Sequence, residues 1–296
     1  WAFLALRREI PVVVAALPGV LQRSGRWISR TLQAPWNGWS RITVILGWIL
    51  IGIVIWHAWP TWYFQATTSL REDETLNIAQ YTSQGFGKAM GEYSLARNHI
   101  FYNVVNSILP GSGSTWPPRA RALSLLSVAC GLGILIFHGF RRGWFLPACF
   151  FAGLVALNPF AMRTLLEARG YGLIFFIAAV AAVAFAEWTR TRSHHWLTVL
   201  AVAAVCGGYT LPYFVVFGGG LILLAFCARP SVETFSAGVL AVAALMMLYA
   251  PVLADVARIA LAYSEDYEGR STFNYDTIDG LFHTIQFLVP HHVATA

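Results

Sequence analysis

Long apolar runs divide the chain into segments of membrane-spanning length. A helix that crosses the roughly 30 Å hydrocarbon core of a bilayer needs about 20 apolar residues. Seven runs approach that length, at 42–59, 120–138, 143–161, 171–188, 196–212, 211–227 and 232–254. Because lipid offers no hydrogen-bond partner to exposed peptide groups, each run is expected to be an α-helix. The pattern therefore predicts an all-α fold, a polytopic transmembrane helical bundle of about seven spans.

The composition supports a membrane protein. Hydrophobic residues make up 57% of the chain and charged residues only 11%, and the mean hydropathy is +0.59. An ordinary soluble domain carries about 25% charged residues. The net charge of +6 comes from 20 basic and 14 acidic residues. A basic patch for nucleic acid is not indicated, because the arginines are better explained by topology and by lipid headgroups.

The placement of the arginines predicts the topology. They precede the first run and fill the short loops on the same side, at positions 7, 8, 23, 26, 30, 41, 141, 142, 190, 192 and 229. By the positive-inside rule that side is cytoplasmic. We therefore expect residues 1–41 to be a cytoplasmic interfacial segment and 42–254 a transmembrane module with an outer loop at 60–119. Residues 255–296 are expected to be an extracytoplasmic loop of a chain that is incomplete at its ends.

The outer loop carries the densest acidic cluster, Arg71-Glu72-Asp73-Glu74. A carboxylate beside the membrane surface could take a proton or bind a cation next to a lipid-borne substrate. Ser69 and Glu72 also match a capping box, which predicts a helix that starts at Ser69. Acids near a helix N-terminus often only complement the helix dipole, so a purely structural role is an equal alternative.

A second amphipathic segment follows in the same loop. Apolar residues recur at helical spacing at positions 100, 101, 104, 105, 108 and 109. His99, Tyr102, Asn103 and Asn106 cover the opposite face. We expect a helix on the outer leaflet with this polar face towards the water.

Two further places put arginines at the outer ends of spans. Arg121 stands at the start of the second run, and Arg163, Glu167 and Arg169 lie between the third and fourth. Arginines are costly at membrane depth and pair with anions there. The partner could be a phosphate carried by a lipid or, alternatively, Glu167 in a local ion pair.

The order of these features resembles a known family. An outer loop with Asp73-Glu74, a segment with His99 and Tyr102, Arg121 at the second span and Glu167-Ala168-Arg169-Gly170-Tyr171 at the fourth are similar to the GT-C superfamily of multispanning glycosyltransferases. Among these, the chain is most similar to the bacterial family 39 enzymes, which resemble protein mannosyltransferases and include the aminoarabinose transferases. The resemblance covers roughly residues 42–230.

The resemblance implies a function and a set of roles. An enzyme of this family moves a sugar from a polyprenyl-phosphate donor to a glycan, lipid or protein acceptor on the extracytoplasmic face of the bacterial inner membrane. It implies that Asp73 is the catalytic base, with Glu74 beside it, and that the reaction inverts the anomeric centre. Substrate contacts are then expected from His99, Tyr102, Arg121, Arg163, Arg169 and Tyr171. A divalent cation could assist, but adjacent Asp73 and Glu74 are not a spacing typical of any metal.

Two other classes of function stay open. A secondary transporter is typically built from internal repeats with broken helices and midplane charges. No repeat is found here, and the charges cluster at the ends of the runs. A non-catalytic assembly or lipid-flipping subunit is the second alternative.

Overall fold

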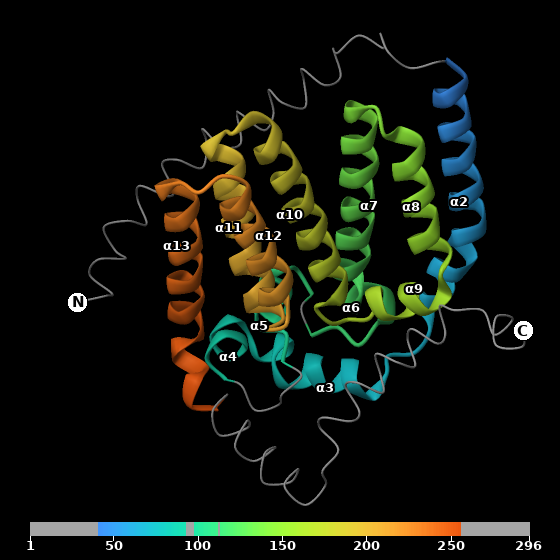
Figure 1. Cartoon of the computed structure of the whole chain (residues 1–296). Coiled ribbons are helices and arrows are strands. Elements are labelled where there is room, and N and C mark those ends of the chain that lie inside the picture. The colour runs from blue at the N-terminus through green and yellow to red at the C-terminus, as the bar shows by residue number, and fades with distance from the viewer. Residues whose placement is uncertain (1–40, 93–97, 112, 256–296) are drawn as a thin grey trace, which may run out of the picture. The chain divides into compact units, whose positions relative to one another are not determined.

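The computed structural model describes residues 41–92, 98–111 and 113–255 (Figure 1). Every regular element in these ranges is a helix, which confirms the all-α prediction. The longer helices are α2 (Arg41–Thr67), α7 (Ala122–Arg142), α8 (Phe145–Leu157), α10 (Tyr171–Thr191), α11 (His194–Thr210), α12 (Phe214–Ala228) and α13 (Val232–Tyr249). The predictions for residues 1–40 and 256–296 lie outside the described residues.

Each of the seven predicted runs contains a helix, but not every helix is long enough to cross a membrane. Within the described ranges, α2, α7, α10 and α13 are long and apolar enough. A fifth span is obtained if α8 is joined to α9 (Pro159–Leu165), from which it is bent by 79°. Proline interrupts a helix because it lacks an N–H donor, and the breaks at Pro159 and near Pro212 shorten the neighbouring helices. The helices are thus compatible with a multi-pass membrane protein of four or five spans, and seven spans are not shown.

The chain divides into two compact units. The first contains residues up to Trp59 together with Gly133–Asn158. Within it, the ring of Phe145 packs edge-on against Trp48, at 5.9 Å between ring centroids, and against Phe140, at 5.3 Å. A side chain at Gly47 would collide with the same ring. Glycine at this position therefore lets α8 approach α2 closely.

The second unit contains Pro60–Leu132 and the chain from Pro159 onwards. Its core is formed by α10, α11 and α12, with α13 packed on α11 and α12 (Figure 1). Leucine, isoleucine and phenylalanine fill this core together with small alanines, at positions 173, 177, 181, 184, 200, 203, 204, 214 and 222. Small residues allow helix backbones to approach closely where lipid supplies no hydrophobic driving force.

The outer loop folds into short helices within this second unit. They are α3 (Glu72–Gln80), η1 (Thr82–Gln84), α4 (Phe86–Gly91), α5 (Ile100–Ile108) and α6 (Pro117–Ala120). The predicted start of α3 at Ser69 is wrong, since the helix begins at Glu72 with Arg71 as N-cap. The Glu74 carboxylate accepts the Arg71 N–H at 2.9 Å and so takes over the capping role, while the Ser69 carbonyl accepts from Arg121.

Helix α5 forms where the periodicity predicts it, but its orientation contradicts our expectation. The polar face is buried, with Tyr102 and Asn103 at 0% exposure, while the apolar stripe runs from fully buried Ile100 to Ile108, which is 65% exposed. The reason is a buried amide network. The side chains of Asn77 and Asn103 exchange hydrogen bonds of 2.8 and 2.9 Å, and Asn103 donates a third, of 2.7 Å, to Asn98. These bonds satisfy polar groups that would otherwise be costly to bury.

Candidate functional site

Glu74 and Arg121 form a fully buried, two-pronged ion pair. Arg121 Nε and Nη2 lie 2.8 and 2.6 Å from the two carboxylate oxygens of Glu74. The side chains are 0% and 4% exposed. The pair joins α3 to the junction between α6 and α7, 47 residues further along the chain.

The surroundings of this pair satisfy both charges. Glu74 also accepts the backbone N–H of Ala168 at 2.6 Å, and the Arg121 guanidinium donates to the carbonyls of Thr68 and Ser69 at 2.9 and 3.3 Å. Burial alone would raise the pKa of Glu74, but these hydrogen bonds hold it below its usual value. Glu74 is therefore ionised at neutral pH, and its oxygens are occupied by protein donors.

Asp73, the preceding residue, lies in a different environment. Its side chain is 42% exposed, and Oδ2 lies 3.3 Å from Nη1 of Arg169. The Arg169 guanidinium is only 9% exposed and lies over the ring of Tyr171, 5.2 Å from its centroid. Asp73 is thus a partly solvent-accessible carboxylate that contacts a buried cation.

His99 completes the packing around Tyr171. The two rings meet edge to face at 4.9 Å, and His99 is 1% exposed. Neither of its ring nitrogens makes a side-chain hydrogen bond of good geometry within the described ranges. Burial, together with the positive charge of Arg169, lowers the pKa of His99 to about 4, an effect that the Thr210 backbone partly opposes. His99 is therefore a neutral imidazole at physiological pH.

Tyr102 is also enclosed. Its hydroxyl lies 3.4 Å from Ser124 Oγ, and burial raises the pKa of Tyr102 well above its usual value. Ser124 in turn donates to the carbonyl of Glu167 at 2.6 Å. Tyr102 therefore contacts, through Ser124, the loop that carries Glu167 and Arg169. Because its side chain is buried, it is not open to a ligand.

Two glycines fix the position of the loop before α10. A Cβ added at Gly170 would lie 2.8 Å from His99 Nδ1, and one added at Gly172 would lie 2.6 Å from the Leu165 carbonyl and 2.8 Å from the Ser124 carbonyl. Such distances are shorter than van der Waals contact. Residues 169–172 can pack this closely on His99 and α7 only because both glycines lack a side chain.

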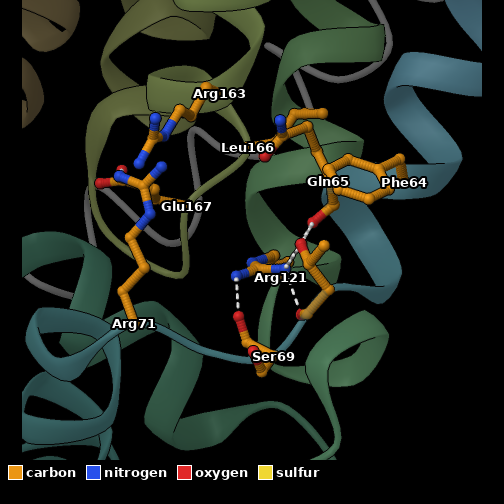
Figure 2. A pocket seen from close by; sticks show the side chains of 9 residues that line it. Phe64, Gln65, Ser69, Arg71, Arg121, Arg163, Leu166 and Glu167 are labelled. Carbon is orange, nitrogen blue, oxygen red and sulfur yellow. Dashed lines mark hydrogen bonds and ion pairs between the residues drawn. The ribbon is translucent and has the colours of Figure 1, made fainter.

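A cavity of about 310 Å³ opens beside this cluster, within the second unit. Arg71 and Arg163 point towards Glu167 on one side of it, and Arg121 lies on the other (Figure 2). Arg71 forms an ion pair with Glu167, and Arg121 is neutralised by Glu74. Arg163 is exposed and has no ion pair among the residues that the structure describes. The cavity therefore has an excess of positive charge.

The local ion pair of Glu167 with Arg169 is present, and a longer-range ion pair with Arg71 is added to it. Arg71, from the start of α3, is its closest cation, while Arg169 Nη1 lies 3.8 Å from the other carboxylate oxygen. Burial raises the pKa of Glu167, and the two arginines oppose this shift. Sequence analysis named Arg71 only as part of the acidic cluster and missed its contact with Glu167, 96 residues away.

The structure brings most of the predicted site residues together in one region. One chain of contacts runs from Asp73 through Arg169 and Tyr171 to His99. The Glu74–Arg121 pair is adjacent to it, since Glu74 follows Asp73 in α3. The 310 Å³ cavity is a neighbouring space, because Arg121 and Arg163 line it but Asp73 and Arg169 do not. Glu167, which contacts Arg169 and faces the cavity, connects the two.

Comparison of the chain with family models, curated proteins and solved structures found no match. Among the described residues, no three His, Cys, Asp or Glu side chains gather in a way that could hold a metal ion.

Proposed function

We propose that this protein is a membrane glycosyltransferase of the GT-C type, which moves a sugar from a polyprenyl-phosphate donor to an extracytoplasmic acceptor. The observation that supports this most directly is the pairing of a part-exposed carboxylate, Asp73, with a neighbouring cavity that carries an unpaired arginine, Arg163. Asp73 contacts Arg169 just before α10, and Arg163 lies on α9, which packs against α10. A sugar transfer from a lipid phosphate needs these two elements close together.

In the proposed reaction, Asp73 accepts the proton of an acceptor hydroxyl or amine as the acceptor attacks the anomeric carbon. The new bond to that carbon forms as the bond to the phosphate oxygen breaks, and the electron pair leaves with the polyprenyl phosphate. Arg163 stabilises the negative charge that grows on the leaving phosphate. A single displacement of this kind inverts the anomeric centre, since no sugar is bound covalently to the protein.

The other residues hold these two in place. Arg169 orients Asp73 through their 3.3 Å contact, Tyr171 packs against Arg169, and His99 packs against Tyr171. The proposal keeps Asp73 as base and assigns Glu74 and Arg121 to the scaffold. This division follows from the buried hydrogen bonds of Glu74 described above.

The test is a reconstituted transfer assay. The purified protein is placed in liposomes with a panel of polyprenyl-phosphate monosaccharides and a membrane lipid extract as the acceptor source. Mass spectrometry then measures the release of free polyprenyl phosphate and the mass added to an acceptor. We expect release with at least one donor. Absence of release with the whole panel, together with no binding of polyprenyl phosphate itself, would show that the proposed function is wrong.

A further inference from the structure

An apolar groove of about 650 Å³ runs along α11, α12 and α13. Its walls include Val205 from α11, Phe226 from α12 and Val239 from α13. It extends along α13 from Thr234 to Leu245, which is about 16 Å at 1.5 Å per residue. That is roughly half of the 30 Å hydrocarbon core, the depth of one leaflet.

A second, smaller cavity of about 170 Å³ lies at one end of this groove. It is formed by the α10–α11 and α12–α13 connections, and Thr234 lines both spaces. Arg192 and Arg229 bring two positive charges and Glu233 brings one negative charge, so the arginines and the glutamate that line the cavity leave a net charge of plus one. Arg192 stacks on Trp188, 4.8 Å from the ring centroid, and this contact holds its guanidinium at the cavity.

This cationic cavity is separate from the site around Asp73. Arg169 lies two residues before the start of α10, and Arg192 directly follows its end. A helix of 21 residues is about 31 Å long, which equals the thickness of the hydrocarbon core. The two sites therefore lie at opposite ends of a helix that is long and apolar enough to span a membrane, and one lipid headgroup cannot occupy both.

From these observations we infer that the groove and the cationic cavity together form a binding site for an anionic diacyl phospholipid of the leaflet opposite the proposed active site. The headgroup phosphodiester contacts Arg192 and Arg229, and one acyl chain lies in the groove between α12 and α13. A phosphodiester with an uncharged headgroup carries one negative charge, which matches the net charge of the cavity. The groove suits an acyl chain of the same lipid, since its walls are apolar and it is about as long as one leaflet is deep. This inference does not depend on the proposed glycosyltransferase activity.

The headgroup contact is tested with the whole protein in vesicles of phosphatidylcholine mixed with phosphatidylglycerol. After extraction in mild detergent, native mass spectrometry counts the phosphatidylglycerol that stays bound. The double variant Arg192→Gln/Arg229→Gln should retain about tenfold less, because two charge-assisted contacts are lost. Arg190→Gln is the matched control. This arginine belongs to the same turn but does not line the cavity, and it should behave like the unmodified protein.

The groove contact is tested with a matched pair of glycines in α12. Gly219 lines the groove and Gly220 does not, and a Cβ added at either position meets no atom within 4 Å. Gly219→Leu should fill the groove and reduce retained phosphatidylglycerol about tenfold, whereas Gly220→Leu should not. Because both leucines raise helix propensity equally, a difference between them reports on the groove.

Two results would overturn the inference. The first is unchanged phosphatidylglycerol retention in both the double arginine variant and Gly219→Leu. The second is complete displacement of phosphatidylglycerol by inorganic phosphate with no effect of Gly219→Leu, which would identify the cavity as a site for soluble anions.

Discussion

Glu74 and Asp73 are neighbours in the first turn of α3, yet the structure gives them opposite surroundings. Glu74 is completely buried and accepts two hydrogen bonds from Arg121 and two from backbone N–H groups. Asp73 is 42% exposed, and its arginine contact is longer, at 3.3 Å. Neighbouring residues on a helix point about 100° apart, so one faces the protein interior and the other the surface.

The difference separates two tasks that the sequence cannot distinguish. A carboxylate whose oxygens are all occupied holds secondary-structure elements together, because a reaction at it would first have to break those bonds. A carboxylate that contacts a cation and still reaches solvent, as Asp73 does, can exchange a proton. The acidic cluster therefore contains a structural acid and a candidate catalytic acid side by side.

The largest effect is expected from Glu74→Gln. The substitution leaves the Arg121 charge buried without its counter-ion, and breaking a buried pair in this way costs about 3–5 kcal/mol. We expect a clearly lower Tm in detergent than for Glu72→Gln, which changes the exposed neighbouring acid. If Glu74→Gln melts like the unmodified protein but has lost transfer activity, the assignment of Glu74 to the scaffold is wrong.

Asp73→Asn should affect turnover and leave folding almost unchanged. Asparagine keeps the shape of the side chain but cannot accept the proton, and loss of a general base lowers the rate by at least about 10²-fold. The measurements are transfer in liposomes and Tm in the same preparation. Near-normal transfer by Asp73→Asn would show that Asp73 is not the general base.

A smaller effect should separate Arg163 from Arg169. Arg163→Gln removes the exposed, unpaired cation of the cavity, so the affinity for a polyprenyl-phosphate analogue should fall about tenfold without a change in Tm. Arg169→Gln should instead lower Tm, because Arg169 is buried and contacts Asp73, Glu167 and Tyr171.

The Arg163→Gln and Arg169→Gln variants can also contradict the roles assigned to these two arginines. A loss of analogue affinity in Arg169→Gln, with none in Arg163→Gln, would place the lipid phosphate at Arg169. The cavity that Arg163 lines would then have another role.

The helices of this fold are largely predictable from the sequence, because apolar runs have one dominant solution in lipid. Their exact lengths are less so. The runs at 196–212 and 211–227 look like two spans, but the turn around Pro212 leaves helices of 17 and 15 residues. Hydropathy averaged over a window does not register where proline ends a helix.

The contacts of the site were harder to predict. The acidic cluster and the arginines were visible, but which arginine pairs with which acid depends on loops that meet across 47 to 96 residues. The prediction that the polar face of α5 points to water was wrong for a related reason. Its polar face looked suited to water because the partners of Asn103, namely Asn77 and Asn98, lie outside the helix and carry no periodic signal.

Gly170 and Gly172, on either side of Tyr171, limit how far the backbone of the site can shift. At Gly172 the space that a methyl group would need is already taken by main-chain oxygen atoms, which cannot rotate away as a side chain can. A single added carbon would push the start of α10 away from α7, and Arg169 would move with it. The position of Arg169, the cation that orients Asp73, thus depends on direct backbone–backbone packing at Gly172. No flexible side chain lies between the two backbones that could adjust to a change there.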